Sequence, residues 1–109
     1  MLFRSISADQ LSLMRQDSIL VNTSRSALIN MSDLQKALAA GRPGQAAIDV
    51  FDIEPLSAND PLRNTPNLLV TPHLGFIAEP IFEAFAKGIT ETLEAWIENK
   101  PVPHPYKPS

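Results

Sequence analysis

Three side chains of different chemistry follow three short apolar segments of the chain. Arg25 follows the first segment, Glu54 the second and His73 the third. A guanidinium binds a carboxylate through two parallel hydrogen bonds, and an imidazole exchanges a proton near neutral pH. A carboxylate beside the imidazole orients it and favours its charged form. Together these residue types predict a site that anchors a carboxylate and moves a proton.

The chain lacks the glycine-rich turn that cradles phosphates. It has only four glycines, and no window reads G-x-G-x-x-G. That turn brings backbone amides to a pyrophosphate group at the start of a helix. Groups for proton chemistry are therefore present in this sequence, while the usual phosphate-binding motif is not.

Composition and charge exclude several classes of partner. The net charge is −3 over 109 residues, so the sequence has no excess of basic residues that would bind nucleic acid or an anionic membrane. With no cysteine, no disulfide or thiolate metal site forms, and the two histidines lie too far apart for a zinc motif. The sequence has no apolar run of membrane-spanning length. We expect a cytoplasmic protein without metal, nucleic-acid partner or membrane partner.

Short apolar segments alternate with helical patterns along the chain. Residues 19–21, 46–50 and 68–70 are typical of strands that are buried on both faces of a parallel sheet. Ser7 predicts a helix start with Gln10 in the reciprocal position of a capping box, and Ser32 predicts the start of a second helix. Gly41 is expected just after the end of that helix.

The last helix has the clearest pattern. Apolar residues recur every fourth position in a stripe made of Ile81, Phe85, Ile89, Leu93 and Ile97. Pro80 suits the first turn of this helix, where an amide would lack a partner. The tail 101–109 holds four of the ten prolines and is expected to be extended.

Alternation of strands and helices predicts an α/β fold with right-handed crossovers and a parallel sheet. Three parallel strands with flanking helices make half of a doubly wound sheet, so we expect a piece of a larger fold. The strand at 19–21 would then have an unpaired edge, which favours pairing with a second copy of the chain. In such sheets ligands bind beyond the carboxyl ends of the strands, where Arg25, Asp49 and His73 are expected to converge.

These motifs resemble, in order and spacing, the carboxyl-terminal part of the D-isomer-specific 2-hydroxyacid dehydrogenases. The resemblance covers roughly positions 5 to 100, and its segments are Leu20-Val21-Asn22-Thr23-Ser24-Arg25, Ala46-Ala47-Ile48-Asp49-Val50-Phe51, Glu54-Pro55-Leu56 and Thr71-Pro72-His73-Leu74-Gly75. It implies that residues 1–100 form the second half of a Rossmann domain that binds a nicotinamide dinucleotide, followed by the proline-rich tail 101–109. Members of the family are much longer, so we expect a fragment that is inactive by itself.

The resemblance also implies roles for the site residues. Arg25 would hold the carboxylate of a 2-oxo acid, and His73 would act as the acid in reduction and the base in the reverse reaction. Glu54 would bind the other nitrogen of the imidazole, and Asp49 would accept from the nicotinamide carboxamide. The implied cofactor is NAD or NADP, and the residues that would line its nicotinamide half are Thr23, Ser24, Arg25, Asp49, His73 and Gly75. The implied partners are a small 2-oxo or 2-hydroxy acid and a second copy of the chain.

The chain departs from the family pattern at two places. Ser26-Ala27 follows the arginine, where the family often has glycine, and Phe76-Ile77 follows Gly75, where small residues are common. Neither change removes a group that the chemistry needs. A bulky Phe76 would narrow the pocket, which leaves the substrate undetermined.

Other readings of the same residues stay open. Taken singly, each site residue is also typical of a structural role. Arg25 would be a surface arginine and Asp49 the cap of a loop. Glu54 would be a solvated carboxylate and His73 a structural histidine. A truncated fragment without activity, or a fragment that serves in an interaction, would retain the same residues without using them in catalysis. A hydrolase built on Ser24, His73 and Glu54 is a remote alternative, because the sequence has no nucleophile elbow.

Overall fold

The computed structural model of the chain describes residues 5–103 and 105. The chain divides into two compact units, Met1–Gly75 and Phe76–Ser109, which are called the N-terminal and C-terminal units below. The predicted boundary at residue 100 remains a prediction.

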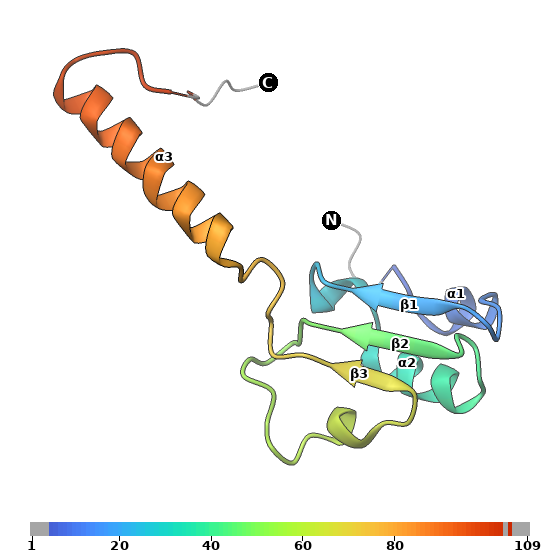
Figure 1. Cartoon of the computed structure of the whole chain (residues 1–109). Coiled ribbons are helices and arrows are strands. Elements are labelled where there is room, and N and C mark those ends of the chain that lie inside the picture. The colour runs from blue at the N-terminus through green and yellow to red at the C-terminus, as the bar shows by residue number, and fades with distance from the viewer. Residues whose placement is uncertain (1–4, 104, 106–109) are drawn as a thin grey trace. The chain divides into compact units, whose positions relative to one another are not determined.

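The N-terminal unit is built on a parallel sheet of three strands. The strands are β1 (Ile19–Asn22), β2 (Gln45–Ile48) and β3 (Leu68–Val70), and they lie in the order β1-β2-β3 (Figure 1). In the register of the sheet, Leu20 pairs with Ala46 and Ala46 with Leu68. The predicted α/β fold with three parallel strands and flanking helices is therefore confirmed.

Two helices of this unit begin at side chains that bind free backbone amides. Ser7 precedes α1 (Ala8–Ser12), and its amide donates to Oε1 of Gln10 at 3.1 Å, as the predicted capping box requires. The helix α2 (Met31–Ala39) begins after Asn30, whose side-chain oxygen accepts from the Asp33 amide at 3.2 Å. The prediction of Ser32 as this cap is wrong, because Asn30 already reaches the amide in the first turn.

The end of α2 agrees with the sequence. Gly41 follows the cap residue Ala40 with a φ of 76°, the left-handed conformation that glycine adopts without a Cβ clash. Two short 3-10 helices, η1 (Ser26–Leu28) and η2 (Pro61–Asn64), lie in the connections after β1 and before β3. The sequence patterns did not predict these single turns.

The helices α1 and α2 pack on one face of the sheet. Their buried residues, Leu11, Leu34 and Leu38, form one cluster with Ile48 and Phe51. The other face is open within this unit, where the side chains of Ile19, Val21 and Leu69 are 62%, 59% and 63% exposed. Burial of the strands on both faces was therefore a wrong prediction for this unit, because its helices cover one side only.

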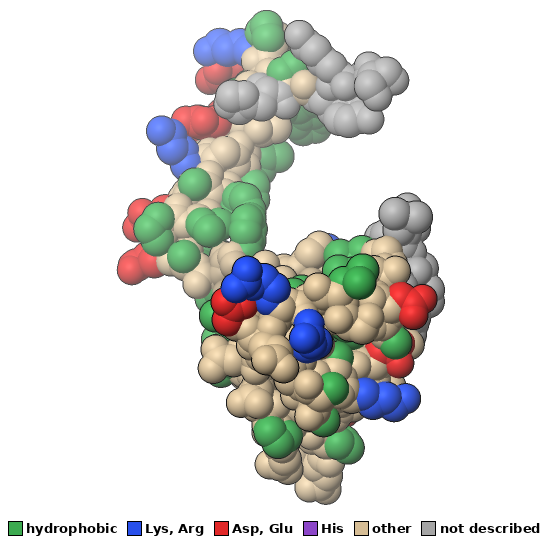
Figure 2. All heavy atoms as spheres, turned by 90° about the vertical axis from the view of Figure 1, so that its right-hand side faces the viewer, with side chains coloured by type: hydrophobic (Ala, Val, Ile, Leu, Met, Phe, Trp, Pro, Cys, Tyr) green, Lys and Arg blue, Asp and Glu red, His purple; other side chains and the backbone are tan. Residues whose placement is uncertain are grey.

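The C-terminal unit contains the long helix α3 (Glu79–Ile97), with Pro80 in its first turn as predicted. Figure 2 shows hydrophobic side chains along this helix. The exposed ones include Phe82, Phe85, Ile89, Leu93, Trp96 and Ile97, each with about half or more of its surface open. The predicted amphipathic stripe is present. In the described part of the chain, no helix is long and apolar enough to cross a membrane. His104 lies outside the described residues.

Within the N-terminal unit one face of the sheet is apolar and open, and among the described residues the outer edge of β1 is not paired with another strand. These two features predict that the chain associates with itself. Burial of apolar surface yields about 25 cal/mol per Å², and an unpaired strand edge offers hydrogen bonds to another strand. Light scattering should show a dimer or larger species at high micromolar concentration. Val21→Lys, which places a charge on the open face, should shift the population toward monomer. A well-folded wild-type monomer at that concentration would contradict the prediction.

Candidate active site

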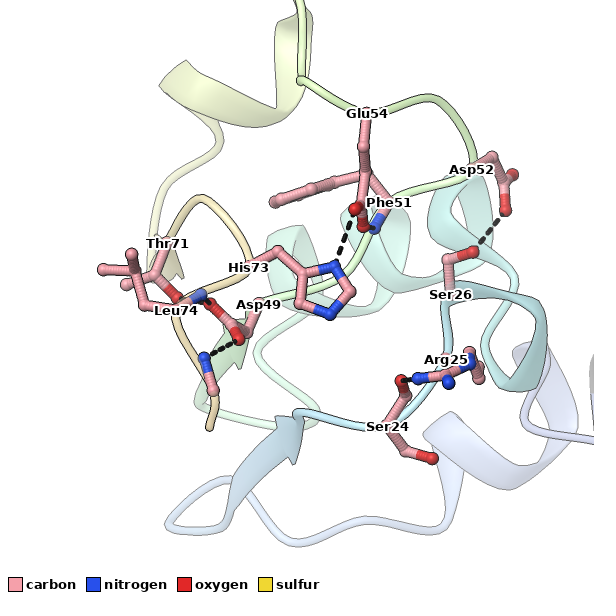
Figure 3. A network of polar contacts seen from close by, with 11 residues as sticks. Ser24, Arg25, Ser26, Asp49, Phe51, Asp52, Glu54, Thr71, His73 and Leu74 are labelled. Carbon is pink, nitrogen blue, oxygen red and sulfur yellow. Dashed lines mark hydrogen bonds and ion pairs between the residues drawn. The ribbon is translucent and has the colours of Figure 1, made fainter. Parts of the chain in front are cut away.

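The site lies where the three parallel strands end. The backbone ladder continues one step past the strands, since the Asp49 amide donates to the Asn22 carbonyl and the Thr71 amide to the Ile48 carbonyl, both at 3.0 Å. The three following loops therefore leave the sheet at the same edge. Figure 3 shows Arg25, Asp49, Glu54 and His73 on these loops. The predicted convergence of polar residues at the carboxyl ends of the strands is present.

Glu54 and His73 form a direct pair. The imidazole Nδ1 lies 2.6 Å from Glu54 Oε2, and the other carboxylate oxygen accepts from the Phe51 amide at 2.9 Å. The Phe51 N–H and then the imidazole hold the pKa of the Glu54 carboxyl below its usual range. An ionised Glu54 accepts the proton on Nδ1 and leaves Nε2 for another group. In Figure 3 this second nitrogen points away from Glu54.

Asp49 anchors the loop that carries His73. Asp49 is buried, with only 5% of the residue exposed. Oδ1 accepts from the Thr71 hydroxyl and from the Leu74 amide at 2.8 Å, and Oδ2 accepts from the Gly75 amide at 2.6 Å. The Thr71 hydroxyl first, and the backbone amides with it, lower the pKa of the Asp49 carboxyl. This anchoring role was not predicted from the sequence.

The backbone at His73 is held in a conformation that few residues adopt. Its φ is 55°, in the left-handed region that costs a non-glycine residue about 1–2 kcal/mol. The bonds from Asp49 to the two residues that follow hold the turn in place. A Cβ at Gly75 would come within 2.9 Å of Asp49 Oδ2, so a larger residue there would displace the Asp49 carboxylate. The geometry of the imidazole therefore depends on Asp49.

Arg25 is positioned by a second buried polar side chain. Asn22, which is 5% exposed, donates from Nδ2 to the Arg25 carbonyl at 3.0 Å and accepts from the Ser24 amide at 3.1 Å. The Arg25 guanidinium donates to the Ser24 carbonyl at 2.8 Å. Among the described residues it forms no hydrogen bond or ion pair with Glu54 or His73. Asn22 was not predicted as a site residue, although a polar residue at the end of an apolar strand could have suggested it.

A pocket of about 390 Å³ opens beside the Glu54–His73 pair. It is lined by Phe51, Glu54, Pro55, Leu56, Arg63, Val70, Thr71, Pro72 and His73. Arg63 fixes the loop on its rim, where Nε and Nη2 donate to the carbonyls of Ser57 and Leu56 at 2.7 and 2.6 Å. No sequence pattern indicated this role, because Arg63 is an exposed residue of η2 and its bonds go to backbone carbonyls six and seven positions earlier in the chain.

Two other kinds of site find no support in the described residues. No group of three or more histidine, aspartate and glutamate side chains there could hold a metal ion. The Ser24 hydroxyl forms no hydrogen bond to His73 in this part of the chain, and Figure 3 shows it directed away from the imidazole. The nucleophile and base of a hydrolase would have to be in hydrogen-bond reach of each other.

The chain belongs to the D-isomer specific 2-hydroxyacid dehydrogenases, since residues 3–75 match the NAD binding domain of that family. It is 35% identical over 98 residues to a glycerate dehydrogenase of Methylorubrum extorquens, and the alignment covers 88% of this chain and 31% of the relative. It is 36% identical over 99 residues to a glyoxylate reductase of Aeropyrum pernix, covering 91% and 30%. A solved Granulicella formate dehydrogenase is 36% identical and superposes with a TM-score of 0.83, covering 95% of this chain and 28% of the other.

These matches confirm the resemblance, the Rossmann-type fold and the nicotinamide cofactor that the sequence predicted. The chain spans about a third of the length of the curated relatives that it matches. The matching family is one of dehydrogenases with an NAD binding domain, and a solved relative from Xanthobacter autotrophicus is a complex with NADPH. The roles of Arg25, Glu54, His73 and the cofactor-lining residues in this chain remain predictions.

Acid should weaken the fold through Asp49. Its pKa is lowered in the folded chain, so the stabilisation is present above the unfolded value near 3.9 and is lost as pH falls through the folded value. Asp49→Asn should lower the urea midpoint at pH 7 and flatten its fall toward about pH 3. Thr71→Val keeps the carboxylate but removes a donor, and should give an intermediate curve. Parallel curves for wild type and Asp49→Asn would contradict this role.

Proposed function

We propose that this chain carries the proton-transfer and carboxylate-binding half of a D-2-hydroxyacid dehydrogenase active site. The reaction is the reduction of a 2-oxo acid to a D-2-hydroxy acid, and its reverse. The observation that carries this proposal is the Glu54–His73 pair at 2.6 Å, at the sheet edge where Arg25 also lies. Family membership supports it, because residues 3–75 match the NAD binding domain of the D-isomer specific 2-hydroxyacid dehydrogenases.

Arg25 binds the substrate carboxylate in this proposal. Its guanidinium is exposed and donates to the neutral backbone carbonyl of Ser24, so other N–H groups of the guanidinium remain for a bidentate partner. Asn22 holds the carbonyl of the same residue and thereby fixes where the side chain starts. A lysine would offer a point charge without the planar fork.

His73 donates the proton that the substrate oxygen needs. With Nδ1 bound to Glu54, the proton on Nε2 passes to the carbonyl oxygen at C2 as that carbon is reduced, and it returns in the oxidation. Glu54 stabilises the cationic imidazole that exists before the transfer. The left-handed backbone held by Asp49 determines where Nε2 lies.

The residues at this edge also suit the nicotinamide end of a cofactor. Asp49 Oδ2 accepts one hydrogen bond among the described residues, so it can accept another from a carboxamide N–H. Thr23, Ser24, Arg25, His73 and Gly75 lie on the adjoining loops and would line the same space. When bound, the reduced cofactor supplies the hydride that adds to C2. The choice between NAD and NADP stays open, because the residue that reads the ribose belongs to the glycine-rich half of such a fold.

The alternative is a chain that keeps the site without using it. An inactive or interaction fragment would retain the fold and the family match, so only activity distinguishes the two. We favour the catalytic reading because both oxygens of Glu54 are engaged in orienting the imidazole.

A chimeric enzyme tests the proposed function. The matching segment of the Aeropyrum pernix glyoxylate reductase is replaced by residues 5–100 of this chain, and NADH oxidation with glyoxylate is measured. The chimera should be active, and His73→Asn within it should lower the rate by about 10²–10⁴-fold, the usual contribution of a general acid. Asparagine tolerates the left-handed backbone, so this variant removes the acid while it keeps the turn.

Two controls accompany the chimera. The 109-residue chain alone should oxidise no NADH with glyoxylate or hydroxypyruvate, since catalytic groups without a phosphate-binding turn do not position the hydride. Circular dichroism should show the same fold in the chimera and its variant. A folded His73→Asn chimera with full activity would rule out the proposed role of His73.

The Glu54 carboxylate should extend reduction to higher pH. Glu54→Gln in the chimera replaces a charge by a neutral amide, so the protonated imidazole loses a stabilising partner. The rate of glyoxylate reduction should therefore fall more at pH 8 than at pH 6. Rate profiles from pH 5 to pH 9 provide the measurement. A uniform loss at every pH would indicate a purely structural role for the carboxylate.

A further inference from the structure

A hydrogen bond joins the loop that carries Arg25 to the loop that carries Glu54. The Ser26 hydroxyl donates to Asp52 Oδ1 at 2.8 Å, across 26 positions of the sequence. Ser26 follows Arg25 directly, and Asp52 precedes Glu54 by two residues. Figure 3 shows this bond between the loop after β1 and the loop after β2. Serine at this place is one of the departures from the family pattern noted in the sequence.

The contacts continue from Asp52 to the imidazole. Asp52 lies within the turn that is closed by the bond from the Phe51 amide to Glu54 Oε1, at 2.9 Å. The second oxygen of Glu54 then binds His73 Nδ1 at 2.6 Å. Two hydrogen bonds, Ser26–Asp52 and Glu54–His73, are thus connected through the backbone of the turn 51–54, and together they link the residue after Arg25 to His73.

The start of the series is also held. The Arg25 carbonyl accepts from Asn22 Nδ2 at 3.0 Å and from the Leu28 amide at 3.2 Å, which begins the 3-10 turn η1. Ser26 is the first residue of η1 and is half-buried. The Ser26 hydroxyl is therefore attached to a backbone that is already held in place. For this reason its bond to Asp52 restrains the loop after β2.

We propose that Ser26 is a positioning residue that sets the separation between the carboxylate-binding Arg25 and the proton donor His73. This inference rests on the proposed function. In a 2-oxo acid the carboxylate and the carbonyl are on adjacent carbons, so their two partners must be held at one short spacing. A misplacement of about 1 Å can lower a rate 10²-fold. The bond therefore favours acids of this kind over those with a more distant carbonyl.

The test uses the 109-residue chain with oxalate. Its two adjacent carboxylates have the spacing of the carboxylate and the carbonyl of a 2-oxo acid, and its binding is measured without a cofactor. Isothermal titration gives the dissociation constant, and NMR follows the Phe51 amide and the His73 ring protons. Ser26→Ala and Ser26→Gly remove the hydroxyl, Ser26→Thr keeps it, and Ser12→Ala removes a hydroxyl bond in α1, away from the site. We expect oxalate binding about three- to tenfold weaker in the first two variants, and unchanged in the others.

The two readouts separate the possible results. If the wild-type chain binds no oxalate, the role of Arg25 in the proposed function fails, and the NMR spectra still decide the inference. Shifts of the Phe51 and His73 signals in Ser26→Ala, with wild-type positions in Ser26→Thr, support the positioning role. Equal oxalate binding in wild type and Ser26→Ala, or spectral changes confined to the neighbours of residue 26, would overturn it.

Discussion

The buried carboxylate of Asp49 holds together the part of the fold on which the site depends. It follows β2, the central strand, and it binds the hydroxyl and the two amides of the loop after β3. A buried charge is stable only when hydrogen bonds replace the water that it loses, and here both oxygens have donors. The same bonds keep His73 in a left-handed backbone conformation that would otherwise be unfavourable. The fold and the orientation of the imidazole therefore share one interaction.

Parallel pairing explains why such a small unit can assemble several functional groups. Its strands have only three or four residues, yet all of them end at the same edge. Each following loop is then shaped by a side chain close to the strand end. Asn22 shapes the loop with Arg25, the Glu54 carboxylate closes its own turn, and Asp49 shapes the loop with His73. Loops restrained in this way can hold polar groups with little support from the core.

The sequence predicted the features that follow from local patterns. Apolar runs located the strands, the capping box located α1, and the order of motifs placed Arg25, Asp49 and His73 at one edge. Ser32 failed as a cap because the choice between Asn30 and Ser32 depends on the backbone before the helix, which propensity alone does not specify. The anchoring by Asn22, Asp49 and Arg63 escaped prediction, because it joins side chains to backbone groups that come close only in the folded chain. The open face of the sheet was missed because a short apolar run looks the same with one buried face or two.

The distribution of charge gives a reason why Arg25 stands apart from the acidic residues. Asp49 and Glu54 both have lowered pKa values, so two negative charges lie near the imidazole at neutral pH. These charges repel an anionic substrate. An arginine paired with either carboxylate would be neutralised, whereas the Arg25 guanidinium contacts an uncharged carbonyl and keeps its charge for an anion. Under the proposed function, the substrate carboxylate is drawn to the loop after β1, and its carbonyl then faces the proton donor on the loop after β3.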